Sequence, residues 1–278
     1  MAYTTIDNPA DYFNTKLYTG NGSTQSITGV GFQPDWVWIK VRSQTHNHYL
    51  YDAVRGAQEK LSSNTDGAEI DMGSTGLTAF NSDGFSIGND TDENASGQTY
   101  ASWNWQAGGT APSQTYTVKV VSDSGNKYRF DDFGTSAVTL ELQEGGTYTF
   151  DQSDSSNATH PLRFYTAADK SGGEYTTGVT TTGTAGSSGA KTVITVAASA
   201  PTLYYQCSSH SGMGGQANTN STFGSSNFSG SIQSTVSAGS TQGFSIVSWT
   251  GTGANATVGH NLGAVPQMFI IKNRSATA

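Results

Sequence analysis

Short stretches in which apolar and polar residues alternate recur along the chain. Strict alternation over four to eight residues is typical of β-strands that bury one face, and two residues of the type Asp-Gly between such stretches indicate a tight hairpin turn. Asp83-Gly84 is such a turn, inside residues 79–88. Only residues 52–62 have a pattern that a short helix could also adopt. The clearest alternating stretches are residues 116–121, 138–142, 147–150, 191–196 and 202–205. The pattern predicts an all-β protein built from antiparallel β-sandwiches.

The chain also contains an internal repeat. Residues 13–22 align with 244–253, and residues 34–43 align with 266–275 after one insertion. Each copy predicts a strand, a Gly-rich turn, a proline, and a second strand that ends in Lys-x-Arg-Ser. We therefore expect tandem β-sandwich domains in which residues 36–40 and 268–272 form equivalent strands.

These patterns divide the chain into six segments. The second copy of the repeat is incomplete, which leads us to expect that the natural polypeptide continues or that another chain completes the sheet. The segments are an N-terminal segment (1–11), a first β-sandwich repeat unit (12–109), a linker (110–115), a separate inserted β-domain (116–222), a second linker (223–242) and the start of the second repeat copy (243–278).

Composition supports a folded β-rich chain and excludes several classes of function. The sequence has 34 Gly and only 12% charged residues, whereas 11% aromatic residues supply area that can be buried. A net charge of −8 without a basic cluster argues against nucleic acid as a partner. The N-terminal stretch resembles no signal peptide, and no segment is long and apolar enough to span a membrane. We find no nucleophile-elbow, P-loop or zinc-protease motif, so we expect no catalysis.

One cluster of residue types points to metal chemistry. Cys207, the only cysteine, is followed at intervals of three residues by His210 and Met213, in a Gly-containing loop after a predicted strand. His160 follows another predicted strand. Two imidazoles and a thiolate, with a weakly bound methionine, are the ligands of electron-transfer copper sites. The sequence thus predicts a copper site formed by His160, Cys207, His210 and Met213. A metal-free sandwich is the main alternative, and zinc is another that assigns no role to Met213.

Residues 116–222 resemble the cupredoxin family on the strength of this ligand order. The resemblance implies a Greek-key sandwich with one type 1-like copper ion held by His160, Cys207, His210 and Met213. One position departs from the family pattern. The residue after the first histidine commonly donates its backbone N–H to the thiolate, but here that residue is Pro161, which has no N–H.

Most of the chain resembles structural proteins of marine tailed phages, including those that infect cyanobacteria. Residues 32–40, 50–56 and 77–85, together with the insert that begins at Tyr116, carry this resemblance. It implies a tail-fibre or decoration-type component of the virion, assembled in the host cytoplasm. Other virion proteins are then the expected partners, as are further copies of the chain (a trimer in a fibre) and a host surface glycan or receptor. The alternative function is that of a soluble copper protein that transfers electrons.

Overall fold

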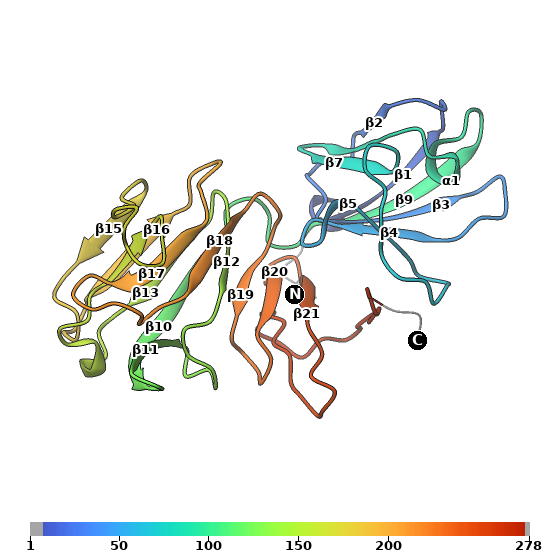
Figure 1. The fold of residues 1–278 in the computed structure, drawn as a ribbon. Helices are drawn as coiled ribbons and strands as arrows, with labels where there is room; N and C mark the ends of the chain where they lie inside the picture. The colour runs from blue at the N-terminus through green and yellow to red at the C-terminus, as the bar shows by residue number, and fades with distance from the viewer. Residues whose placement is uncertain (1–7, 276–278) are drawn as a thin grey trace. The chain divides into compact units, whose positions relative to one another are not determined.

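The computed structural model describes residues 8–275, and almost all of its regular structure is β-strand (Figure 1). The chain divides into two compact units. Unit 1 comprises residues 1–109, 237–246 and 261–278, and unit 2 comprises residues 110–236 and 247–260. The all-β sandwich class predicted from the sequence is confirmed. Among the described residues, no helix has the length and hydropathy needed to cross a membrane.

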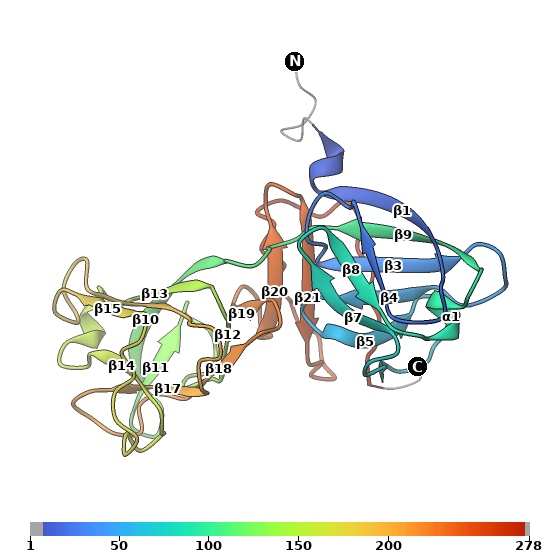
Figure 2. The same ribbon diagram turned by 90° about the horizontal axis from the view of Figure 1, so that it is seen from above.

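Unit 1 contains two facing sheets. Figure 2 shows β1, β9, β3 and β4 side by side in the larger sheet, whose order is β1-β9-β3-β4-β5-β6; the smaller has the order β2-β8-β7. Alternate residues of β3, including Val37 and Ile39, are fully buried in the core, whereas Trp36 and Trp38 lie on the opposite face. The strands are β1 (Phe13–Thr19), β2 (Gln25–Thr28), β3 (Trp36–Val41), β4 (Tyr49–Asp52), β5 (Gly56–Ser62), β6 (Ile70–Asp71), β7 (Leu77–Asn81), β8 (Gly84–Ile87) and β9 (Thr99–Trp105).

The strands of unit 2 form a second sandwich with an aromatic core. One sheet has the order β11-β10-β13-β16-β15 and the other β12-β18-β17-β14. Tyr116, Phe130, Phe150 and Phe164 are fully buried in this core. The strands are β10 (Ser113–Ser122), β11 (Asn126–Phe130), β12 (Leu140–Gln143), β13 (Thr147–Asp151), β14 (Leu162–Tyr165), β15 (Val179–Thr182), β16 (Lys191–Thr195), β17 (Leu203–Cys207) and β18 (Gln216–Asn220). Most strand pairs are antiparallel, but β10 with β13 and β12 with β18 are parallel.

The helical structure within residues 8–275 consists of three short turns: η1 (Pro9–Asp11), α1 (Thr91–Asn94) and η2 (Ser155–Asn157). The hairpin predicted at Asp83-Gly84 is present as β7 and β8, and Gly84 has a φ of 139° that favours glycine. The possible helix over residues 52–62 is absent. Those residues instead form the β4–β5 turn and β5, because cross-strand pairing with β4 outweighs a weak local helical preference.

Residues 223–242 contain strands rather than a linker. β19 (Ser225–Asn227), β20 (Ser234–Gly239) and β21 (Phe244–Trp249) form a three-stranded sheet. Small polar residues lie buried here because they are hydrogen-bonded: the Ser226 carbonyl accepts from the Tyr116 hydroxyl at 2.8 Å. Phe228 belongs to the core of unit 2. A Ser-rich composition therefore concealed ordered strands.

The strand expected over residues 268–272 does not form. This segment is irregular, and its apolar side chains are exposed, with Phe269 at 77%. Within residues 8–275, no strand pairs with its backbone, and β-propensity alone cannot maintain a strand without a ladder partner. Residues 261–278 fall within unit 1 rather than in a unit of their own. Residues 1–7 of the expected N-terminal segment, and 276–278 of the second copy, lie outside the described residues.

Candidate metal centre

Cys207 is the last residue of β17, and its thiol points into the core of unit 2. Leu203, Tyr205 and Cys207 alternate along the strand, and all three are fully buried. This is the orientation that two-residue periodicity predicts. The Gln206 side chain is also buried, and its carbonyl oxygen accepts hydrogen bonds from the N–H groups of Met213 and Gly214. These bonds fold the loop after β17 back over the end of the strand.

His160, two residues before β14, lies beside the Cys207 thiol. Leu162 is paired with Cys207 in the antiparallel β14–β17 ladder, so a residue two positions before Leu162 lies beside the end of β17. The turn formed by η2 precedes it, with the Asp154 side chain accepting from the Ser156 N–H. Thr159, at φ 68°, then turns the chain immediately before His160. A left-handed conformation is unusual for a β-branched residue, and such strain often accompanies a constrained site.

The geometry brings two imidazoles to one thiol. The Sγ atom of Cys207 lies 3.8 Å from Nδ1 of His160 and 3.5 Å from Nδ1 of His210. The two imidazole rings are 4.6 Å apart, and the three ligand atoms all lie within 4.8 Å of one another. A metal–sulfur bond of ~2.3 Å and metal–nitrogen bonds of ~2.0–2.1 Å, meeting at tetrahedral or trigonal angles, place sulfur and nitrogen about 3.6–3.8 Å apart. The residues present therefore fit a mononuclear metal ion.

His210 lies in an exposed loop that one ammonium group holds. The Nζ atom of Lys170 donates to the carbonyl oxygens of Cys207, Ser208 and His210, at 3.1, 3.3 and 3.4 Å. At the far end of the loop, Lys127 donates to the Gly212 carbonyl. His210 itself is exposed, whereas His160 is partly buried and Cys207 is inaccessible. The site is thus closed on the sulfur side and open to solvent on the imidazole side.

Met213, the fourth predicted ligand, is almost completely buried at 2% exposure in the same core cluster as Cys207. Its carbonyl accepts from the Tyr128 N–H at 2.8 Å, which ties the loop to β11. The thioether is a soft donor, and Cys207 in the same core cluster is a second sulfur donor of the kind that a soft metal ion prefers.

The surroundings favour the ligand form of His160. Burial, and then the neighbouring His210, lower the pKa of His160 below its usual value. The neutral imidazole that coordinates a metal is thereby favoured at neutral pH. The carbonyl oxygen of His160 accepts from the Tyr128 hydroxyl at 2.8 Å and from the Gln152 amide at 3.2 Å. Burial, followed by the nearby Cys207, raises the pKa of Tyr128 well above its usual range, so the phenol remains a donor.

Pro161 is placed as the sequence implies. It carries no N–H, and its carbonyl accepts from the Ser208 N–H at 3.0 Å, which extends the β14–β17 pairing. The backbone therefore offers the thiol no donor at this position.

Sequence reasoning missed the residues that hold the ligands in place. Lys170, Tyr128 and Gln152 come from three separate segments of the chain, and no local motif identifies them. Their roles depend on tertiary contacts to backbone carbonyl groups, which have no sequence signature.

Comparison with known proteins identifies a family but no function. No curated protein and no solved structure matches the chain. One family model, described as a domain of unknown function (DUF7483), matches residues 8–138 and 216–278, which is more than half of the chain. The match omits residues 139–215, the segment that contains all four predicted ligands. The chain belongs to the DUF7483 family.

Proposed function

We propose that the chain carries a cupredoxin-like copper module, in which His160, Cys207 and His210 hold one copper ion and Met213 is a weaker fourth ligand. The observation that supports this proposal is the convergence of both imidazole Nδ1 atoms on the buried thiol, at 3.5 and 3.8 Å. These separations suit zinc as well as copper. The buried Met213 thioether, which zinc does not need, favours copper.

A copper ion in this site would supply one-electron redox chemistry. The chain itself provides a buried thiol that is shielded from solvent and one exposed imidazole. Lys170 and Gln206 hold the loop in position before any metal binds, so little rearrangement is needed on binding. An exposed imidazole next to a buried sulfur suits electron exchange with a partner at the surface.

The proposal is tested by titrating Cu(II) into the purified chain and recording visible absorption. A thiolate–Cu(II) bond gives an intense visible band, which we expect at one equivalent. Cys207→Ser should abolish the band and leave the far-UV circular dichroism unchanged. Ser208→Ala, at the exposed neighbouring position, should retain it. Absence of the band from the unmodified chain, with tight binding of one zinc ion instead, would contradict the copper assignment.

For the chain as a whole, we propose a structural or adhesion role in a tailed-phage virion, as tail fibre or decoration. The family match supports different roles for the metal-binding segment and for the rest of the chain. It excludes the segment with the proposed metal ligands and covers most of unit 1. The copper module is then an addition to a scaffold whose role is not redox chemistry. Immunogold labelling of purified particles tests this role. Label on particles supports it, whereas a chain found only in the soluble fraction, with rapid electron exchange with a redox protein, supports the alternative of a soluble electron carrier.

A further inference from the structure

One surface of unit 1 displays aromatic side chains that no core uses. Trp36 and Trp38 alternate with buried residues along β3, and Trp103 and Trp105 do so along β9. The register places Trp36 opposite Trp105 and Trp38 opposite Trp103. All four indoles are therefore on the outer face of the six-stranded sheet, and all are partly exposed.

These rings form a continuous strip. Ring centroids are 4.6 Å apart for Trp36 and Trp105, and 6.0 Å apart both for Trp36 and Trp38 and for Trp38 and Trp103. Phe13 extends the strip across β1, with its centroid 4.7 Å from that of Trp105. A soluble domain rarely exposes contiguous aromatic surface without a use for it.

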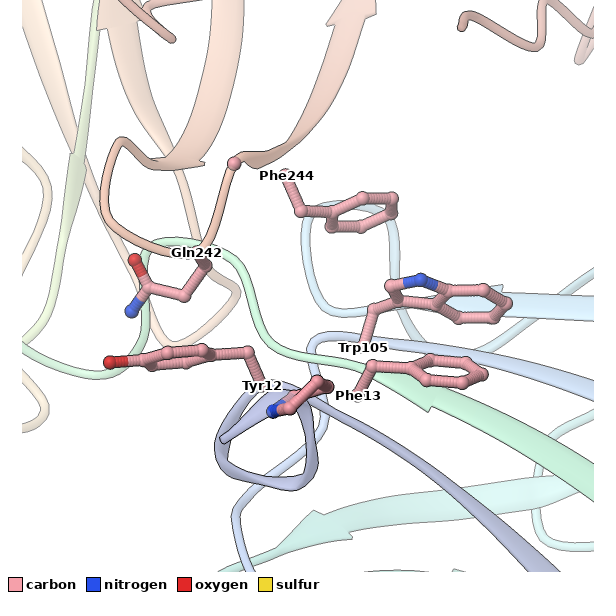
Figure 3. Close-up of a pocket in the computed structure, with 7 residues that line it drawn as sticks. Tyr12, Phe13, Trp105, Gln242 and Phe244 are labelled. Carbon is pink, nitrogen blue, oxygen red and sulfur yellow. The ribbon is translucent and has the colours of Figure 1, made fainter. Parts of the chain in front are cut away.

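The strip ends in a pocket of about 330 Å³. Figure 3 shows the rings of Phe244, Trp105 and Phe13 in a row, with the Tyr12 and Gln242 side chains extending in the opposite direction. The other lining residues are Pro9 and Gly243, so the lining carries no charge. Its volume is at the lower end of the range for small-molecule sites.

The pocket also offers free polar groups. Within residues 8–275, neither the Tyr12 hydroxyl nor the side-chain carbonyl of Gln242 makes a hydrogen bond, and the Gln242 amide makes only a long one of 3.5 Å to Gln106. Aromatic surface next to an unused hydroxyl and an unused amide suits a ligand with an apolar face and a rim of hydroxyl groups. A charged ligand would lose its hydration here without gaining a partner.

We propose that this face of unit 1 binds a neutral oligosaccharide, with one pyranose ring in the Tyr12–Gln242 pocket and the following rings along the tryptophan strip. The C–H faces of a pyranose can cover aromatic rings, and its hydroxyl groups can pair with Tyr12 and Gln242. A linear strip matches a chain of sugars better than a single one. Oligosaccharide binding of this kind would be independent of the metal site in unit 2.

The test uses the full chain with glucose, cellohexaose and maltohexaose as probes, followed by tryptophan fluorescence and calorimetry. Four of the five tryptophans lie on the strip, so binding should change the emission. A single ring in a small pocket should have a Kd of about 1 mM or weaker, and at least one hexasaccharide should bind at least tenfold more tightly than glucose.

Variants separate the pocket from the strip. Gln242→Ala and Tyr12→Ala should each weaken both glucose and hexasaccharide by about threefold to tenfold. Trp38→Ala should weaken only the hexasaccharide, and Trp249→Ala, an exposed tryptophan in unit 2, should change neither. If Trp38→Ala does not fold, the two pocket variants, which alter partly exposed side chains, still decide the question.

Two results would overturn the proposal. One is the absence of any emission change with all three sugars at about 10 mM, where a hexasaccharide that binds at least tenfold more tightly than glucose would occupy the strip. The other is binding of the dye 1-anilinonaphthalene-8-sulfonate, whose aromatic rings cover apolar surface while its sulfonate stays in water, without any sugar binding. That result would make this face a purely apolar surface.

Discussion

At Cys207, the alternation of β17 turns the thiol inward, which is also the direction in which the proposed metal site needs it. Its place on the inward face of β17 removes the thiol from solvent. The antiparallel partner β14 and the following loop then bring His160 and His210 to the sulfur. The buried thiol therefore faces two polar ring nitrogens, a contact that apolar core packing alone does not require.

Met213→Leu tests the fourth ligand. Leu has nearly the same volume as Met, so the core should lose less than about 1.5 kcal/mol of unfolding free energy. If the thioether is a weak ligand, its loss disfavours Cu(II) relative to Cu(I), and the reduction potential should rise while the thiolate band remains. Redox titration of the copper-loaded chain measures this change. An unchanged potential would show that Met213 serves only to fill the core.

Unit 1 contains a buried carboxyl group that the sequence did not reveal. Glu93 is completely buried, and its Oε1 accepts from the Tyr51 hydroxyl at 2.6 Å, while the Lys60 ammonium lies 3.7 Å away. Burial raises the pKa of Glu93 from 4.5 to about 7. Asp35 behaves in the same way, because burial raises its pKa from 3.8 to about 6.

These carboxyl groups predict that unit 1 becomes less stable as pH rises. A raised pKa means that the folded chain binds the proton more tightly than the unfolded chain does. The stabilisation is complete below about pH 4.5 and is lost as pH rises through about 7, on the order of 3 kcal/mol for Glu93. Glu93→Gln should remove most of the dependence of the unfolding free energy on pH, whereas Glu174→Gln, at an exposed position, should leave that dependence intact. Urea unfolding followed by tryptophan emission at pH 5 and pH 8 measures the difference.

At the scale of the elements, alternation predicted the strands that bury one face. β10, β12, β13, β16 and β17 all appear where the pattern placed them. The two parallel ladders were not predictable, because the pattern of a single strand does not reveal the direction of its partner. β19 was missed because its polar residues are buried through hydrogen bonds rather than by apolar packing. β11 was also missed, although it buries Tyr128 and Phe130 in the aromatic core.

The cluster of Cys207, His160 and His210 was predictable because Cys207 and His210 are three residues apart at the end of one predicted strand and His160 lies near another. The structure brings both histidines to the cysteine: His160 lies two residues before β14, and His210 lies in the loop after β17. The aromatic strip was hidden for a different reason. Its tryptophans look like core residues in the sequence, and only the register shows that they all lie on the outer face.

Lys170→Gln tests whether the loop after β17 is held in position. A shorter neutral side chain cannot donate to all three carbonyl groups that Lys170 now contacts. Groups that orient metal ligands typically contribute tenfold to a hundredfold in affinity, so we expect a loss of that size for Cu(I). Competition with a chelator measures the affinity, and Lys191→Gln is the control at an exposed lysine of the same unit. Equal affinities for both variants would show that the loop is fixed by other contacts.

At the scale of the whole molecule, the chain combines segments that match the DUF7483 family with one segment, residues 139–215, that does not. The family match covers unit 1 from residue 8 onward and, in unit 2, includes β10, β11, β18 and β19, whereas β12 to β17 lie in the unmatched segment. The aromatic core of unit 2 is nevertheless continuous across both, since Phe130 of β11 packs against Phe150 of β13 at 5.7 Å. The metal-bearing segment is therefore part of the sandwich core rather than a loop on its surface.

This arrangement predicts that metal binding stabilises only one unit. All four proposed ligands belong to unit 2, and a ligand that binds the folded form at a hundredfold excess over its Kd adds about 2.7 kcal/mol to the unfolding free energy. For a unit of this size, Tm should rise by on the order of 5–10 °C. Calorimetry of the chain with and without Cu(I) should show one shifted transition, whereas the emission of the four strip tryptophans should report an unshifted transition of unit 1. Cys207→Ser should abolish the shift. A single transition that moves as a whole would show that the two units unfold cooperatively and would contradict this prediction.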